Sequence, residues 1–126
     1  MSDDAGDIYR RVTQAFSTGD RAVLEELIAE DVIWHTDDLQ VAVPSTFNGR
    51  DEFFAAAGTP SQHISAWEIT PQVVVSDGDT AFSHQIDRFT MKDGTHLEIH
   101  FLLHITLNEK GQIKEVWEFG QSALPH

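Results

Sequence analysis

The last quarter of the chain carries the feature that most constrains its fold, an alternation of apolar and polar residues over 96–105. Side chains in a strand point alternately to its two faces, so this pattern predicts a strand with one apolar face. The residues on that face are Leu97, Ile99, Phe101, Leu103 and Ile105. The opposite face carries His96, Glu98, His100 and His104. A loop over 108–111 and a second apolar-rich run over 112–119 follow, which together predict a β-hairpin whose apolar face covers a core or a cavity.

The second arm of this hairpin places a carboxylate among apolar neighbours. Strict alternation assigns one face of the arm to Ile113, Glu115, Trp117 and Phe119. It assigns the other face to Lys114, Val116 and Glu118. Glu118 is therefore the first candidate for a functional group.

The first half of the chain predicts three helices and two short strands. Ser2 or Asp3 is available as the N-cap of the first helix and Gly19 as its stop, while Asp20 caps a second helix that ends before Glu30. The third helix is expected to start around 48–52 and to end at Gly58. The first helix is expected near 4–17 and the two strands at 32–36 and 41–43.

From His63 onward, glycine turns divide the chain into four strand-forming arms. The turns are Asp77-Gly78, Asp93-Gly94 and Lys110-Gly111. Pro71 lies in the first arm, and because proline cannot donate to a ladder, we expect that arm at the sheet edge. Long strands twist and curl, so helices can lie across the concave face and leave a cavity. The prediction is one α+β domain over 1–126: three N-terminal helices against a curved, cone-shaped antiparallel sheet, after a disordered start at 1–4.

The composition limits the partners that this chain can have. Its 21 acidic and 8 basic residues give a formal charge of −13, which repels nucleic acid and anionic lipid. The absence of cysteine excludes disulfides and thiolate chemistry. No long apolar run and no Gly-rich phosphate loop or dinucleotide fingerprint occurs, so we expect a cytoplasmic protein without membrane contact or cofactor.

Four short motifs follow one another along the chain: the Gly19-Asp20 turn between two helices, EDVIWH at 30–35, NGRDEFF at 48–54 and EVWEFG at 115–120. Their order resembles the nuclear transport factor 2-like superfamily, in particular its SnoaL-like members. The resemblance implies a cystatin-like α+β cone. The superfamily includes ketosteroid isomerase, polyketide cyclases, limonene epoxide hydrolase and scytalone dehydratase, and also members that only bind or dimerise, so the fold does not decide the function.

Two of these families can be compared with the chain residue by residue. The positions of the three working groups of ketosteroid isomerase carry Val12, Thr36 and Leu103. A small register shift would bring in Asp37 or Asp38 as a base, and Tyr9 lies one turn before Val12. Polyketide cyclases place an acid/base carboxylate on the last strand, where this chain has Glu118. The cavity-facing residues implied by this resemblance are Trp34, Thr36, Asp38, Phe82, His84, Ile86, Arg88, Phe101 and Leu103.

These comparisons assign roles to a small set of side chains. Glu118 would be the acid/base, because desolvation in an apolar cavity suits a carboxylate to proton transfer near neutral pH. His84 and Asp38 would be proton partners, and Arg88 would anchor a carbonyl or anionic group. The remaining substrate-binding walls would be Trp34, Thr36, Ile86, Phe101, Leu103 and Val116. Alternatives are a structural Arg88–Glu118 ion pair, an Arg88–Asp87 salt bridge, and a His84 that is only hydrogen-bonded in the core.

The histidines of the 96–105 strand do not indicate a metal site. His100 and His104 lie about 13 Å apart on a strand at about 3.3 Å per residue, so one ion cannot bind both. His96, Glu98 and His100 are expected at a dimer interface or in solvent. We expect no metal and no cofactor, and a homodimer formed through the outward face of the sheet.

The sequence therefore predicts a cofactor-independent enzyme of SnoaL-like type. Its substrate would be a small, mostly apolar, carbonyl-bearing or polyketide-like molecule, and the reaction an isomerisation, cyclisation, dehydration or epoxide hydrolysis. The alternative is a non-catalytic ligand-binding or dimerisation module of the same fold.

Overall fold

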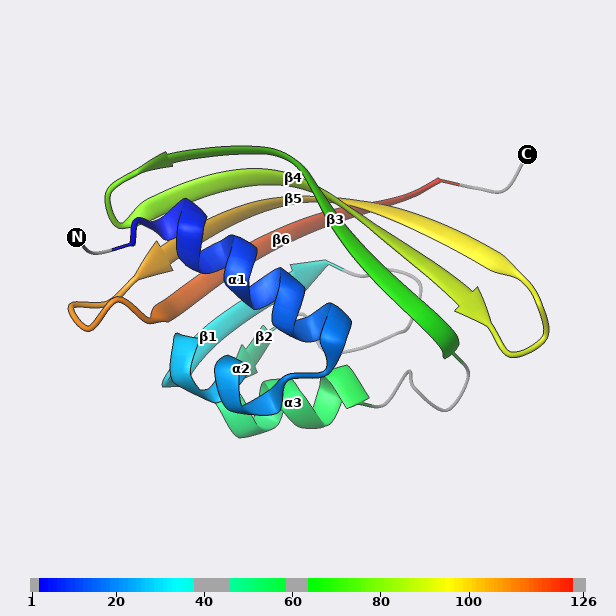
Figure 1. Cartoon of the computed structure of the whole chain (residues 1–126), viewed down its shortest axis with the longest axis horizontal. Coiled ribbons are helices and arrows are strands. Elements are labelled where there is room, and N and C mark those ends of the chain that lie inside the picture. The colour runs from blue at the N-terminus through cyan, green and yellow to red at the C-terminus, as the bar shows by residue number, and fades with distance from the viewer. Residues whose placement is uncertain (1–2, 38–45, 59–63, 124–126) are drawn as a thin grey trace.

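The computed structural model describes residues 3–37, 46–58 and 64–123, and these residues form three helices and one six-stranded sheet. Figure 1 shows the sheet as a long curved layer with the helices on one side of it. The elements are α1 (Ala5–Thr18), α2 (Arg21–Leu27), β1 (Ile28–Asp37), β2 (Thr46–Asn48), α3 (Arg50–Gly58), β3 (Ile64–Asp77), β4 (Thr80–Met91), β5 (His96–Leu107) and β6 (Ile113–Ala123). The predicted α+β architecture is confirmed.

Side-chain caps fix the ends of α1. Asp4 is the N-cap and accepts a hydrogen bond from the Asp7 amide at 2.9 Å, while the Asp7 carboxylate accepts from the Asp4 amide. Asp4 is therefore the cap in place of the predicted Ser2 or Asp3. Ser76 of β3 also donates to Asp4 at 2.8 Å and ties this end to the sheet. Gly19 ends the helix with φ of 72°, a conformation that glycine adopts without strain.

The second helix is shorter than its apolar pattern suggests. Asp20 caps it, as predicted, by accepting from the Val23 amide at 3.2 Å. The helix ends at Leu27 because Ile28 is already extended and opens β1, which is longer than the predicted strand 32–36. The predicted strand 41–43 lies outside the described residues. No helix within the described ranges is long and apolar enough to cross a membrane.

The strand order in the sheet is β2-β1-β6-β5-β4-β3. The three glycine turns join β3 to β6 into the predicted antiparallel meander, and β3 with Pro71 is an edge strand, as expected. The pairing of β1 with β6 is parallel, which corrects the wholly antiparallel prediction. A parallel pair needs a long connection, and the chain between these strands supplies one. This pairing brings the end of β1 beside Glu118, since Thr36 is its register partner.

One face of the sheet packs against the helices to form the core. On β5 the buried residues Ile99, Phe101, Leu103 and Ile105 alternate with outward ones, as the sequence predicts. On β6, Ile113 is buried together with Val116, so its predicted position on the opposite face is wrong. The reason is a register shift between Thr106 and Leu107, where β6 holds an extra residue against β5. Such a bulge resets the alternation of the residues that follow it.

Candidate functional site

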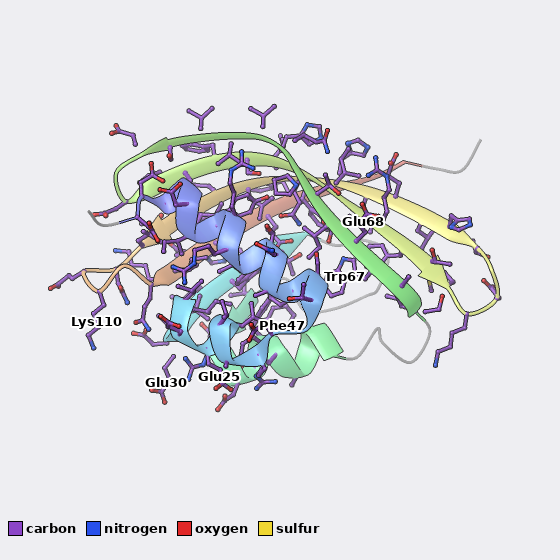
Figure 2. All side chains as sticks on the ribbon, viewed as in Figure 1. Glu25, Glu30, Phe47, Trp67, Glu68 and Lys110 are labelled. Atoms are coloured by element: carbon purple, nitrogen blue, oxygen red, sulfur yellow. The ribbon has the colours of Figure 1, made fainter. Side chains whose placement is uncertain are left out.

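A cavity of about 130 Å³ lies between the inner face of the sheet and helices α1 and α3. By the same measure one water molecule needs about 10–15 Å³, so the cavity has room for a small organic molecule. Most of its walls are aromatic or aliphatic, among them Phe47 of β2 and Trp67 of β3, which are labelled in Figure 2. The polar residues that line it are Tyr9, Thr13, Thr36, Gln85, Asp87 and Glu118.

The first polar feature of the cavity is a pair formed by Glu118 of β6 and Trp34 of β1. The indole Nε1 of Trp34 donates a hydrogen bond to Oε1 of Glu118. Phe53 of α3 stacks on the Trp34 ring with 4.0 Å between ring centroids and therefore holds the indole in place. The pair thus orients a carboxylate toward mostly apolar surroundings, where it can accept or deliver a proton.

The second polar feature is a hydrogen-bond network around Asp87 of β4, a residue that is only 3% exposed. Asp87 accepts hydrogen bonds from Nε2 of Gln85 at 2.6 Å and from Nε1 of Trp67 at 3.1 Å. Gln85 in turn accepts from the Tyr9 hydroxyl at 2.7 Å, and Tyr9 accepts from the Ser83 hydroxyl at 2.8 Å. The side chains of α1, β3 and β4 are therefore linked by one chain of hydrogen bonds.

Tyr9 is held as a neutral phenol in this network. Burial raises its pKa, and the negative charges of Asp87 and Glu118 raise it further, whereas the hydrogen bond from Ser83 acts in the opposite direction. Because its proton is donated to Gln85, Tyr9 acts as a structural link between α1 and β4 in this structure.

A row of aromatic rings connects the two carboxylates. Phe89 and Trp67 have centroids 5.4 Å apart, and Trp67 and Phe16 are separated by 6.2 Å. Phe16 meets Phe53 edge-on at 5.8 Å, and Phe53 stacks on Trp34. The cavity is therefore bordered by an aromatic arc that has a tryptophan–carboxylate pair near each end.

The structure brings six of the predicted site residues to the cavity. Glu118 lines it together with Trp34, Thr36, Phe101, Leu103 and Val116. Their roles in binding or catalysis stay predictions. The cavity is also lined by Val12, Thr36 and Leu103, the residues at the three positions of the ketosteroid isomerase working groups. The cavity therefore lacks the isomerase working groups at these three positions. Asp38 lies outside the described residues.

The predicted inward face of β4 is wrong by one residue. It was assigned to Phe82, His84, Ile86 and Arg88, which do not line the cavity. The inward side chains of this strand are Ser83, Gln85, Asp87 and Phe89. His84 and Arg88 instead contact β5, where Nε2 of His84 lies 2.9 Å from Nδ1 of His100 and Arg88 pairs with Glu98 at 3.0 Å. The error arose because the inner residues are mostly polar, whereas Phe82 and Ile86 supply apolar residues to the outer face.

Sequence reasoning missed the hydrogen-bond network on the cavity wall. Asp87, Gln85 and Trp67 were not assigned to the site, and Tyr9 was considered only as a substitute for an isomerase residue. The alternation Ser83, Gln85, Asp87 could have revealed a polar face, but it has the same period as an ordinary solvent-facing pattern. No cluster of three or more side chains suited to a metal ion occurs in the part of the chain that the structure describes.

Comparison with known proteins points to one family. The model of the SnoaL-like domain matches residues 9–116 and ends just before Glu118. No curated protein sequence matches the chain.

Solved structures with the same fold share little sequence with this chain. IdmH, a proposed polyketide cyclase from Streptomyces antibioticus, is 23% identical, with 91% of this chain and 90% of that chain covered and a TM-score of 0.77. An epoxide hydrolase from M. tuberculosis, described as LEH-like, is 10% identical over 91% and 80% of the two chains, with a TM-score of 0.73. A Catenulispora acidiphila protein with a ketosteroid isomerase-like fold is 15% identical over 89% and 83%, with a TM-score of 0.72. These likenesses establish the fold alone.

Proposed function

The chain belongs to the SnoaL-like domain family, and we propose that it is a cofactor-independent enzyme in which Glu118 transfers a proton on a small, mostly apolar, carbonyl-bearing molecule. The observation that carries this proposal is the position of Glu118 on the cavity wall, hydrogen-bonded to the Trp34 indole. An indole N–H is a neutral donor, so it orients the carboxylate without supplying a positive charge. Polyketide cyclase and epoxide hydrolase structures share this fold, which is compatible with such chemistry.

The cavity walls suit a compact apolar substrate. Phe101, Leu103 and Val116 surround the inner face near Glu118, and apolar contact with them would bind the hydrocarbon part of the ligand. Thr36 is the register partner of Glu118 across β1 and β6, and its hydroxyl is a candidate donor to the substrate carbonyl. In the proposed step the Glu118 carboxylate removes a proton from the carbon next to the carbonyl. The electron pair of that C–H bond then moves into the enolate.

The proposal can be tested without knowledge of the natural substrate. A panel of small cyclic ketones and diketones in D₂O would be followed by NMR for exchange of the α-hydrogen with and without the protein. We expect exchange with at least one ketone, and its loss in Glu118→Gln. The matched control is Glu115→Gln on the same strand, because Glu115 lies on the outer face against His35. Unchanged exchange in Glu118→Gln, with folding verified by circular dichroism, would remove Glu118 from the mechanism.

A non-catalytic ligand-binding module is the second candidate. It is favoured by the cavity positions of Val12, Thr36 and Leu103, which carry no isomerase group, and by a Tyr9 hydroxyl already bound to Gln85. In that case small apolar ligands would raise the melting temperature of the protein, but no ketone in the panel would exchange faster than in buffer.

We also propose that the outer face of the sheet is the contact surface of a homodimer. Five apolar residues on strands β3 to β6 are each more than half exposed: Val73, Val75, Phe82, Leu102 and Phe119. Contiguous exposed apolar groups of this kind mark interaction surfaces. Leu102→Glu should shift the molar mass measured by light scattering from dimer to monomer. A monomeric wild-type protein would contradict this assignment.

A further inference from the structure

Asp87 is a buried carboxylate that the proposed proton transfer does not use. It lines the same cavity as Glu118, and two neutral groups, the Trp67 indole and the Gln85 amide, donate to it. Burying an ionised carboxylate costs free energy through lost hydration. A group of this kind, fixed in a ligand cavity by donors from two strands, is suited to meet a charge or a hydrogen-bond donor on a ligand.

The surroundings of Asp87 favour a positive charge on that ligand. Trp67, which donates to Asp87, stacks on Phe89 and lies next to Phe16. Tyr9 is linked to Asp87 through Gln85. Aromatic faces carry a negative partial charge and attract cations, most strongly when the cation is desolvated. Among the described residues that line the cavity, both charged groups are carboxylates, Asp87 and Glu118.

We propose that the ligand carries a substituted ammonium group, which Asp87 and the aromatic rings near Trp67 bind. This inference rests on the proposed function, since it takes the same cavity as the ligand site, and it assigns the substrate class: a small apolar molecule with a basic nitrogen. Asp87 then acts as the cation anchor and Glu118 as the proton-transfer group, at the two ends of the aromatic arc.

An organic cation fits this end of the cavity better than a metal ion. Hard metal cations take several oxygen ligands, whereas the walls of the cavity that Asp87 lines are mostly aromatic or aliphatic. Aromatic walls with an added carboxylate favour alkylated ammonium groups, because methyl groups pack against the rings while the charge remains close to their faces.

The test compares two probes of nearly equal shape, choline and its uncharged carbon analogue 3,3-dimethylbutan-1-ol. Each is titrated into the protein, and binding is followed by NMR shifts and by tryptophan fluorescence, since Trp34 and Trp67 line the cavity. We expect choline to bind about tenfold or more tightly than the alcohol. Asp87→Asn should abolish that preference and leave the affinity for the alcohol nearly unchanged. Equal affinities of the wild-type protein for the two probes, or no binding of choline, would overturn the proposal.

Glu118→Gln is the matched control, because it neutralises the other cavity carboxylate. The preference for choline should persist in this variant, and its disappearance there with retention in Asp87→Asn would overturn the assignment to Asp87. If Asp87→Asn does not fold, the wild-type comparison together with Glu118→Gln still decides the outcome. The ketone-exchange assay tests the proposed function independently of choline binding. Exchange that does not depend on Glu118 would contradict the catalytic assignment, whether or not the cavity prefers choline.

Discussion

Removal of one hydroxyl group tests the hydrogen-bond network between α1 and β4. The change is Tyr9→Phe, which keeps the ring of a residue that is 2% exposed and deletes only its oxygen. In the wild-type protein that oxygen donates to Gln85 at 2.7 Å and accepts from Ser83 at 2.8 Å. Both partners are buried, so the substitution removes two hydrogen bonds and leaves two polar groups without them.

The expected loss follows from typical hydrogen-bond energies. Each bond contributes about 0.5–1.5 kcal/mol, and a buried group left without a partner costs about 1–3 kcal/mol unless it finds another. We therefore expect the free energy of unfolding to fall by about 2 kcal/mol. Unfolding entropy of about 2.1 cal/mol/K per residue gives about 0.26 kcal/mol/K for 126 residues. The melting temperature should fall by about 8 °C.

Urea denaturation followed by circular dichroism measures this loss, and a double-mutant cycle with Ser83→Ala locates its origin. If the two hydroxyl groups are bonded, the double variant should be less destabilised than the sum of the single variants, with a coupling of about 1 kcal/mol. A Tyr9→Phe variant that is as stable as wild type would refute the reasoning. So would full additivity, because it would show that the Ser83–Tyr9 bond contributes nothing.

Three further predictions follow from the same geometry. Because the pKa of Tyr9 is raised in the folded protein, its phenol loses the proton first in the unfolded state as the pH rises. The contribution of Tyr9 to the free energy of unfolding is therefore complete below about pH 10 and falls above it by up to about 1.4 kcal/mol per pH unit. Tyr9→Phe should remove this part of the pH dependence of stability, as measured by urea denaturation at alkaline pH. Leu103→Ala on the inner face should cost about 2–5 kcal/mol by the same urea assay; a loss of less than about 1 kcal/mol would contradict the assigned inner face of β5. Arg88→Ala breaks an exposed ion pair with Glu98, so it should change the free energy of unfolding by less than about 1 kcal/mol. Ketone exchange should stay unaltered, and a loss of exchange would restore Arg88 to the site.

Much of the fold could be predicted because local chemistry and tertiary structure agree there. Asp20 caps α2, Gly19 ends α1, and Pro71 marks the sheet edge, each for a reason confined to a few neighbouring residues. The parallel pairing of β1 with β6 has no such local signal, because it joins segments distant in sequence. The bulge in β6 could have been detected, since Ile113 and Val116 are both large and apolar but three residues apart, a spacing that strict alternation cannot bury on one face.

The misassigned faces of β4 have a physical explanation that bears on function. Periodicity identifies the inner face of a strand by its apolar residues, which holds when that face contacts an apolar core. In β4 the inner face instead carries Ser83, Gln85 and Asp87, which form a buried hydrogen-bond network on the wall of a cavity. A buried polar face is costly unless its groups are bonded, so a fold without a ligand to recognise would gain by replacing it with apolar residues. The sequence pattern misleads where β4 carries a buried polar face instead of apolar packing, and this exception supports the proposed role of Asp87 in ligand recognition.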